Sequence, residues 1–286
     1  MPSTQDIRRR IKSVKSIQQI TKAMEMVAAA RLRRAQERAN SSRPYTQKIR
    51  EALLHVASNL KDDDVHPLLE VRDVKRTGYL VLSSDKGLAG AYASNLIKEV
   101  LPAVRGKDNV GLITVGRKPR DYFRRRQYQI DHEYTGFSEK PAYENAVVIA
   151  RDLANDFIAG KYDEIYLVYT RFVSPIVQKP ATIKLLPATG QANEQEKAVS
   201  HSEYIFEPSA TEVLNLLVPK YLETVIYGAL LQSAASELGA RMTAMGSATT
   251  NAQDLIAKLV LNYNKVRQAT ITREISEIVG GAEALK

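Results

Sequence analysis

The chain has 286 residues, of which 44% are hydrophobic and 26% are charged, proportions typical of a folded globular protein. It contains no cysteine, which excludes disulfides, thiolate metal sites and thiol switches, and its four histidines are scattered without the spacing of metal ligands. The formal net charge is +9, and residues 1–50 alone carry 13 Lys and Arg against three acidic residues, so the rest of the chain is nearly neutral.

This basic arm fits an acidic partner, whether phosphate, anionic lipid or an acidic protein surface. Two simpler interpretations are a solvated helix face and a cleaved transit peptide. The acidic residues in the arm, and a helical pattern that runs beyond thirty residues, argue against a transit peptide. No run approaches the ~20 apolar residues of a membrane span, so we expect membrane association to be peripheral or through a partner.

Residues 3–40 predict a long helix with an apolar stripe on one face. The stripe consists of Ile7, Ile11, Val14, Ile17, Ile20, Met24 and Val27. At residues 28–30 the side chains are all alanine, so a partner backbone could approach closely there. Pro44 is expected to break or kink the helix, with residues 51–60 as its continuation.

Residues 77–187 alternate short apolar runs with amphipathic stretches, which predicts a compact α/β domain with a largely parallel sheet. The expected strands are 78–83, 110–115, 128–133, 164–173 and 181–186, and the expected helices are 91–104, a short basic helix ending at Arg126, and 141–159.

The last seventy-odd residues, from about Thr211 to Ala284, predict a second, longer helix. Spacings of four and three alternate along a heptad seam made of Leu238, Met242, Met245, Thr249, Ala252, Ile256, Leu259, Tyr263 and Val266. The stripe then resumes one step out of phase at Ile271, Ile275 and Ile278, so a supercoil should relax there.

Neither long helix can bury its stripe alone, and the α/β region between them can close a hairpin. We therefore expect an antiparallel two-helix coiled coil plus a central Rossmann-like α/β domain. The expected division is an N-terminal helix over 1–60, the α/β domain over 75–190 and a C-terminal helix over 208–286. A two-helix rod has no second layer of core, so a surrounding sleeve of other subunits is a natural completion.

Two local features suggest binding functions, one for phosphate and one for nucleic acid. The turn at Ser83–Gly90 (SSDKGLAG) follows a strand and precedes a helix, where α/β folds bind phosphate, but it matches neither Walker A nor GxGxxG spacing. A basic patch at Arg117–Arg126 could bind nucleic acid, although no RNA-binding aromatic motif accompanies it. No catalytic triad or carboxylate pair can be assembled, so the residues favour a non-catalytic rod with a globular domain.

Four stretches resemble one family along the whole chain. Residues 236–252 (SELGARMTAMGSATTNA) and 263–282 (YNKVRQATITREISEIVGGA) closely resemble the C-terminal signature of the γ subunit of F-type ATP synthases. Residues 7–14 (IRRRIKSV) and 20–28 (ITKAMEMVA) are similar to the N-terminal helix of that family, and residues 84–90 (SDKGLAG) also match.

The resemblance implies a rotor without catalytic residues, cofactor or metal. The paired helices would turn inside three α and three β subunits, and the α/β domain would form a foot on the membrane c-ring, held by the ε subunit. Ion-driven rotation would thereby drive conformational cycling of the catalytic β subunits. It also implies a peripheral place on the cytoplasmic face of the cell membrane and no nucleic-acid partner.

The resemblance further assigns site residues. Those near the catalytic β subunits are Lys22, Met24, Arg267, Gln268 and Thr272, and those of the foot, facing the c-ring or ε, are Asp85, Lys86, Tyr204 and Glu207. Plain coiled-coil packing is an equal interpretation of Met24. The absence of cysteine implies no thiol control, and the start close to the first motif favours a bacterial protein.

Two other classes stay open at this point. One is a basic coiled-coil protein that binds nucleic acid, with an affinity that falls steeply with salt. The other is a regulator that binds a nucleotide at residues 84–90.

Overall fold

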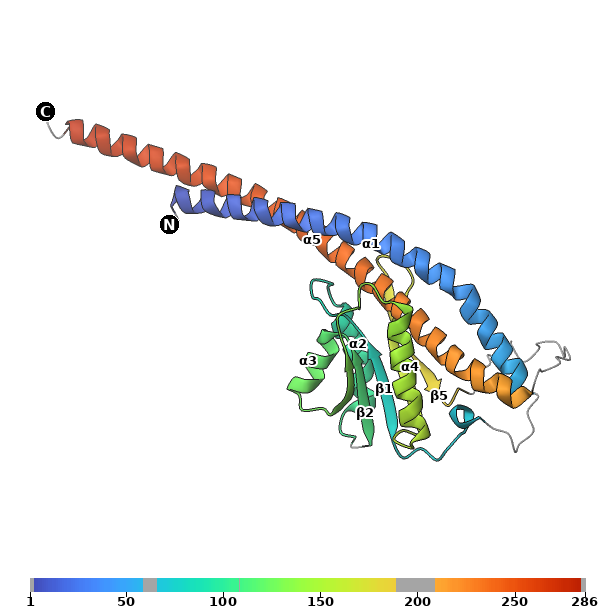
Figure 1. Cartoon of the computed structure of the whole chain (residues 1–286). Coiled ribbons are helices and arrows are strands. Elements are labelled where there is room, and N and C mark those ends of the chain that lie inside the picture. The colour runs from blue at the N-terminus through green and yellow to red at the C-terminus, as the bar shows by residue number, and fades with distance from the viewer. Residues whose placement is uncertain (1–2, 59–65, 108, 189–208, 284–286) are drawn as a thin grey trace. The chain divides into compact units, whose positions relative to one another are not determined.

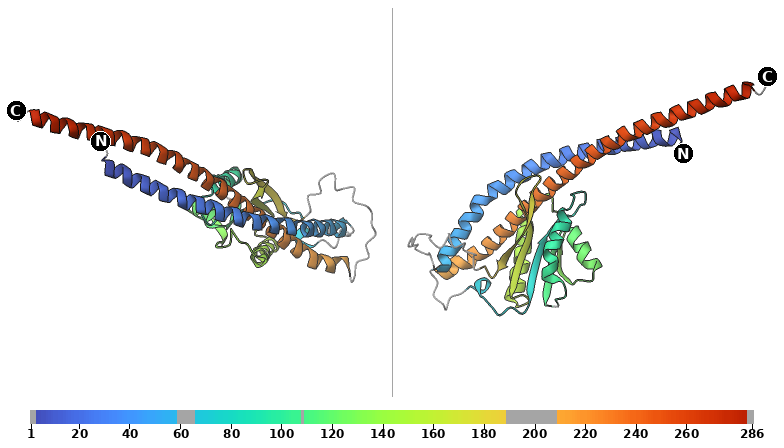
Figure 2. Two further views of the ribbon diagram at one scale, coloured as in Figure 1. Left: turned by 90° about the horizontal axis from the view of Figure 1, so that it is seen from above. Right: turned by 180° about the vertical axis from the view of Figure 1, so that it is seen from behind.

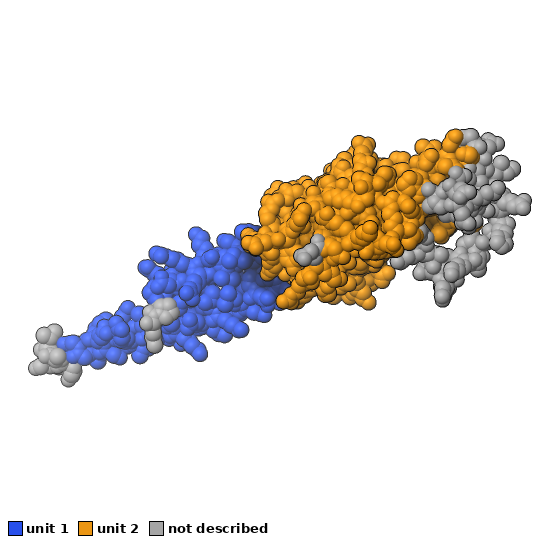
Figure 3. All heavy atoms as spheres, turned by 90° about the horizontal axis from the view of Figure 1, so that it is seen from below, with its two compact units in different colours: residues 1–28, 242–286 blue, residues 29–241 orange. Residues whose placement is uncertain are grey.

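The computed structural model describes residues 3–58, 66–107, 109–188 and 209–283. It forms two compact units: unit 1 combines residues 1–28 with 242–286, and unit 2 spans residues 29–241 (Figure 3). Two long helices, α1 and α5, contribute to both units (Figure 1). The three-part division expected from the sequence stays a prediction.

In chain order the elements are α1 (Thr4–Ser58), the 3₁₀ turn η1 (Pro67–Leu69), β1 (Thr77–Leu82), α2 (Tyr92–Val104), β2 (Val110–Val115), α3 (Arg117–Arg125), β3 (Ile130–Tyr134), α4 (Tyr143–Ile158), β4 (Glu164–Phe172), β5 (Gln178–Leu186) and α5 (Ala210–Glu283). The five strands form one sheet in the order β3-β2-β1-β4-β5. All pairs are parallel except β4 with the edge strand β5. The predicted Rossmann-like domain is thus confirmed, with one antiparallel edge.

The central strand β1 places alternate side chains in two cores, as the two-residue period of a strand requires. Leu80 and Leu82 point into one core with α4, while Val81 points into the other with α2 and α3. All three side chains are almost fully buried. The sheet is therefore the middle layer of unit 2, with α4 on one face and α2 and α3 on the other (Figures 1 and 2).

The unit 2 parts of the long helices complete the core on the α4 side. Leu53 and Val56 of α1 join it, and α5 contributes Leu214, Val218, Leu222 and Ile226, spaced by four residues. Each of these buried side chains is worth roughly 1.5–3 kcal/mol. This packing anchors both helices to the α/β domain.

One window of α5 has a mean hydropathy of 1.2 over 18 residues, which passes a length-and-composition test for a membrane span. The sequence had indicated no such stretch among its apolar runs. Core helices of soluble proteins pass the same test, and 39% of this window is buried. The apolar side chains of α5 between Leu214 and Ile226 are taken up by the core of unit 2.

The predicted heptad seam of α5 is confirmed in unit 1. Between residues 251 and 282, the residues that are not exposed are Ala252, Ile256, Leu259, Tyr263 and Val266, all of them on the seam. A repeat of 3.5 residues keeps this stripe on one side of the helix.

The predicted stripe of α1 is wrong at Ile17, Ile20 and Val27. The stripe of buried and half-buried positions runs through Ile7, Ile11, Val14, Gln18, Thr21, Glu25 and Ala28, again with alternating steps of four and three. Ile17, Ile20 and Val27 instead lie on the outside and are 49%, 58% and 51% exposed. The sequence interpretation followed apolar identity from residue 14 to 17, whereas the seven-residue period leads from 14 to 18.

Pro44 does not break α1, which continues through it to Ser58. The helix bends in this stretch (Figure 1). Proline removes one backbone donor, and neighbouring hydroxyls bond back to helix carbonyls, Ser41 to Glu37 and Thr46 to Ser42, a pattern that often accompanies bends. The predicted break is therefore wrong, and the alternative of a kink agrees with the bend.

Gly116, between β2 and α3, has no room for a side chain. Its φ is +101°, and an added Cβ would lie 2.6 Å from the carbonyl oxygen of Ser83. Gly116→Ala should lower the free energy of unfolding by about 3 kcal/mol, combining left-handed strain with a backbone clash. Urea unfolding measures this loss. Gly136 has a φ of +99° and nothing within 4 Å of the added Cβ, so Gly136→Ala is the matched control for strain alone. Equal losses in both variants would contradict the close packing at Gly116.

Asp163 accepts hydrogen bonds from the backbone N–H groups of Lys75 and Arg76, at 2.7 and 2.8 Å. These bonds hold the pKa of Asp163 below its ordinary value of 3.8. The stabilisation is therefore present above that pH and lost as the pH falls through the lowered pKa. Asp163→Asn should cost about 1–2 kcal/mol at neutral pH, with the difference from wild type shrinking in acid. Thermal unfolding against pH checks this, with the exposed Asp254→Asn as the control for charge removal. A difference that does not shrink as the pH is lowered would contradict it.

Candidate functional site

The two helices of unit 1 run antiparallel. Arg8 donates a 2.6 Å hydrogen bond to the hydroxyl of Tyr263, and the hydroxyl of Thr249 donates to that of Thr21 at 2.8 Å. From the first contact to the second, the chain advances 13 residues along α1 and goes back 14 along α5. This constant relation confirms the antiparallel coiled coil and fixes its register.

The α1 site residues lie on and beside this seam. Lys22 is exposed, and its ammonium group forms a 3.2 Å ion pair with Glu25. Met24 is half-buried. Gly246 of α5 faces this turn, because a Cβ added there would lie 3.5 Å from the Glu25 carboxyl carbon. Lys22 therefore lies on the exposed side of α1, whereas Met24 is partly used in packing.

The α5 site residues lie in the part of the helix that follows the seam. Every residue from Arg267 to Ala282 is exposed, so the helix makes no buried contact there. Gln268 and Thr272 are four residues apart and share one face, with Arg267 beside them. Ile271, Ile275 and Ile278 are exposed to 47%, 56% and 72%, so the predicted out-of-phase stripe has no partner within the described residues.

In unit 2, the Gly-rich turn after β1 is organised by Asp85. Its carboxylate accepts hydrogen bonds from the backbone N–H groups of Arg117, Gly136 and Ser138, at 3.1, 2.9 and 3.1 Å. The N–H of Asp85 in turn donates to the hydroxyl of Ser138 at 3.0 Å. Asp85 thus joins the loops after β1, β2 and β3 at the carboxyl edge of the parallel sheet.

The bonds of Asp85 argue against the alternative that a nucleotide binds at residues 84–90. At that edge of a doubly wound sheet, backbone N–H groups usually bind phosphate. Here the N–H groups of Arg117, Gly136 and Ser138 already donate to a carboxylate that belongs to the chain. A nucleotide phosphate would have to displace Asp85, and the like charges of the two anions would oppose it.

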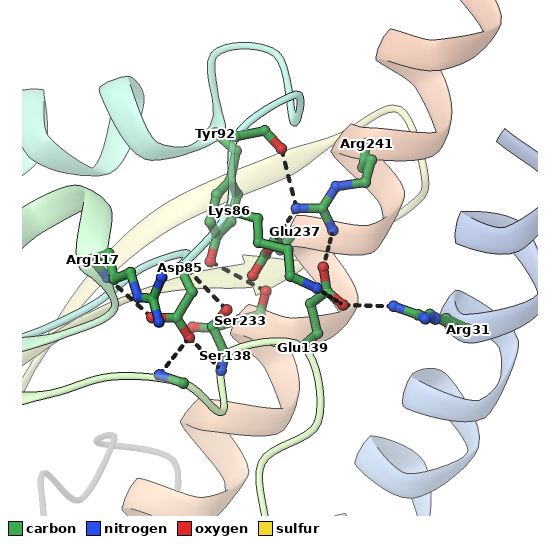
Figure 4. Close-up of polar contacts among 12 residues, drawn as sticks. Arg31, Asp85, Lys86, Tyr92, Arg117, Ser138, Glu139, Ser233, Glu237 and Arg241 are labelled. Carbon is green, nitrogen blue, oxygen red and sulfur yellow. Dashed lines mark hydrogen bonds and ion pairs between the residues drawn. The ribbon is translucent and has the colours of Figure 1, made fainter. Parts of the chain in front are cut away.

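Next to this turn, Glu139 lies between both long helices (Figure 4). Its carboxylate oxygens are 2.6 Å from Nη1 of Arg31 on α1 and 2.9 Å from Nη1 of Arg241 on α5. Lys86 of the Gly-rich turn forms a third ion pair at 3.1 Å. Arg241 also donates to the carbonyl oxygen of Gly87 at 3.3 Å. One carboxylate therefore connects two loops of the α/β domain to α1 and α5.

Glu237 is the second carboxylate of this cluster. Its side chain is 1% exposed, and it pairs at 2.6 Å with Nη2 of Arg241, whose side chain is 8% exposed. Burial raises the pKa of Glu237, while Arg241 acts in the opposite direction. Above the cluster, the hydroxyl of the buried Tyr92 donates to the Ser233 carbonyl, which again joins α2 to α5. A charged group this buried requires its partner, so Arg241 is essential to the arrangement.

The basic patch on α3 is partly neutralised within the chain. Arg124 pairs with Glu133, Arg120 pairs with Asp121, and the Arg126 guanidinium lies 3.7 Å from the ring centroid of Tyr122. Nucleic-acid binding would have to compete with these contacts. Within the described part of the chain, no group of three or more His, Cys, Asp or Glu side chains could hold a metal ion.

Several predicted and unpredicted residues meet in this cluster. Asp85 and Lys86 were predicted, but Glu139 stands in a loop without any sequence signal. Glu237 and Arg241 are spaced as a helical ion pair inside an otherwise apolar stretch, and that pattern could have revealed them. Tyr204 and Glu207 lie outside the described residues.

The fold and these surfaces define a class: a protein that presents an α/β domain on an antiparallel pair of long helices. A family model described as ATP synthase matches residues 3–285. The ATP synthase gamma chain of Heliobacterium modesticaldum is 49% identical over 100% of both chains, and that of Pelotomaculum thermopropionicum is 51% identical over 100% of both.

A solved structure of the central stalk and c-ring of the Tetrahymena thermophila mitochondrial ATP synthase contains a similar chain. It is 27% identical, with a TM-score of 0.62, and the match covers 80% of this chain and 99% of that one. The chain therefore belongs to the family of ATP synthase gamma chains, and it is a component of the membrane-associated ATP synthase complex.

The antiparallel register predicts a specific cross-link. Because the hydroxyls of Thr21 and Thr249 touch, Thr21→Cys with Thr249→Cys should place two sulfurs within disulfide geometry. The chain has no other cysteine, so a mild oxidant should convert most of the double variant to the cross-linked form, as judged by non-reducing electrophoresis. Thr250 is exposed, so Thr21→Cys with Thr250→Cys is the control and should cross-link far less. Equal cross-linking of both variants would contradict the register.

Proposed function

We propose that this chain is the central rotor of an F-type ATP synthase, and that it couples ion-driven rotation of a membrane ring to conformational cycling of the catalytic β subunits. The observation that carries this proposal is the full-length match to gamma chains at 49% and 51% identity. On this proposal the chain contributes no catalytic residue itself. It acts by making different contacts with subunits in different conformations, which shifts their populations.

Exposed apolar residues on the helix pair support a surrounding sleeve of three α and three β subunits. Ile17, Ile20 and Val27 form an outer stripe on α1. On the last turns of α5, Ile271, Ile275 and Ile278 extend the apolar surface. Such residues on a soluble helix favour burial against a partner.

The positive charge of the N-terminal helix supports a place for this helix next to acidic surfaces of that sleeve. The first 50 residues carry a net charge of +10, and Lys22 extends from their helix into solvent. We propose that Lys22 and the neighbouring Met24 face the acidic lobes of the catalytic β subunits. Arg267, Gln268 and Thr272, all exposed on α5, are proposed to hydrogen-bond a loop of one β subunit.

At the other end, we propose that the α/β domain forms the foot on the c-ring and is held by ε, on the cytoplasmic face of the membrane. Tyr204 and Glu207 are proposed contacts of the foot. Asp85 and Lys86 are assigned there by resemblance, and their bonds to Ser138 and Glu139 support a role in shaping that domain.

Assembly of the complex tests the proposal. A tagged chain isolated from its source membranes should bring down a large ATPase, with one copy of this chain to three copies of each large subunit by quantitative mass spectrometry. The isolated chain should hydrolyse no ATP. Recovery of the chain alone, or with nucleic acid, would overturn the proposal.

Arg267→Ala combined with Gln268→Ala should impair coupling in the assembled complex. Loss of two hydrogen-bonding side chains, one of them charged, removes about 1.5–3 kcal/mol of contact with the β subunit, which corresponds to roughly a tenfold or greater loss of ATP synthesis. Thr270 is the matched control, because its hydroxyl already bonds to the Val266 carbonyl at 2.9 Å. Thr270→Ala should synthesise ATP at the wild-type rate, and an equal loss in both variants would contradict the assignment.

A further inference from the structure

We propose that Glu139 is the positioning residue that fixes the α/β domain against rotation about the two long helices, an inference that rests on the proposed function. Its carboxylate is bonded to Arg31 on α1, to Arg241 on α5 and to Lys86 in the domain (Figure 4). It is thus a joint through which a twist applied to the domain reaches both helices.

The joint at Glu139 lies away from the apolar core that holds the long helices to the domain. The core that holds α5 to the domain uses residues from Leu214 to Leu230, and α1 joins it at Leu53 and Val56. Apolar burial is non-directional, so it does not by itself select one orientation of the domain. Arg241 lies 11 residues beyond Leu230, or ~17 Å along the helix at 1.5 Å per residue. A domain fixed at two points this far apart cannot swivel about either of them.

The second anchor on α5 is built from directional contacts. The side chain of Gln232 accepts from the N–H of Phe172 at 3.0 Å, and the hydroxyl of Ser236 donates to the Thr170 carbonyl at 3.0 Å. These bonds join the end of β4 to α5. Both of these bonds hold α5 and leave out α1. The bond between Glu139 and Arg31 connects α1 to the same part of the domain.

The chemistry of the joint demands a carboxylate. Oε1 of Glu139 accepts from Arg241, and Oε2 accepts from both Arg31 and Lys86. The side chain is only 14% exposed, so these charge-assisted bonds are poorly screened. A glutamine of the same shape would keep one acceptor oxygen, but it would turn an amide N–H₂ group towards a cation. Glu139→Gln therefore removes the joint without removing the volume.

The test has two readouts. In the isolated full chain, Glu139→Gln should raise amide hydrogen exchange about tenfold in the loops around Gly87 and Ser138, as expected for the loss of ~1.4 kcal/mol, while β1 and β4 exchange as before. In the assembled complex, ATP hydrolysis should continue, and the torsional stiffness between the α/β domain and the helix pair, measured by single-molecule rotation, should fall at least twofold.

Two further variants keep the test decisive. Glu37→Gln is the matched control, since this exposed carboxylate on α1 pairs with Arg33 one turn away, and it should change neither readout. Lys86→Gln removes one exposed partner of the joint, and it should give a smaller change of the same sign if Glu139→Gln fails to fold. Unchanged exchange and unchanged stiffness in Glu139→Gln would overturn the joint. Failure of the wild-type chain to assemble with an ATPase would instead overturn the proposed function and leave the exchange readout valid.

Discussion

Unit 1 depends on a thin seam between two helices. Its α1 side includes Gln18, Thr21, Glu25 and Ala28, so polar and small side chains occupy positions that a stable isolated coiled coil fills with Leu or Ile. Each of them buries far less apolar surface than a leucine, while the contact of Thr21 with Thr249 fixes the register. The seam therefore specifies how the helices pair more than it stabilises them. Three larger apolar residues of α1, Ile17, Ile20 and Val27, lie on the outside instead.

In unit 2, a globular domain is attached to two helices at more than one point. Apolar packing supplies one attachment, around Leu222 and Leu53, and ion pairs around Glu139 supply the other. The carboxyl edge of the sheet, which binds phosphate in many doubly wound folds, is here closed by Asp85. The edge that binds phosphate in those folds here joins three loops of the domain to one another.

Sequence periodicity predicted most of the architecture because long helices and buried strands repeat their patterns many times. The α5 seam and strand β2 at Val110–Val115 were predicted to the residue. The α1 seam was missed because the apolar residues there do not occupy the buried positions. Ile17 and Ile20 are apolar and exposed, while Thr21 is polar and buried. Pro44 was overrated as a helix breaker, since α1 continues through it to Ser58. Glu139 could not be predicted, because its partners Arg31 and Arg241 are more than a hundred residues away in sequence and meet it only in the fold.

The outward placement of the apolar residues also follows from the proposed rotation. A rotor must be held along its axis and yet pass through several angular positions. Isolated apolar side chains such as Ile271 and Ile275 on a smooth helix give non-directional contact, which holds the axis without selecting an angle. Charged groups such as Lys22 and Arg267 act over a Debye length of roughly 8–10 Å and favour particular angles. A surface that combines sparse apolar residues with separate cations can thus be retained by a sleeve and still be turned within it.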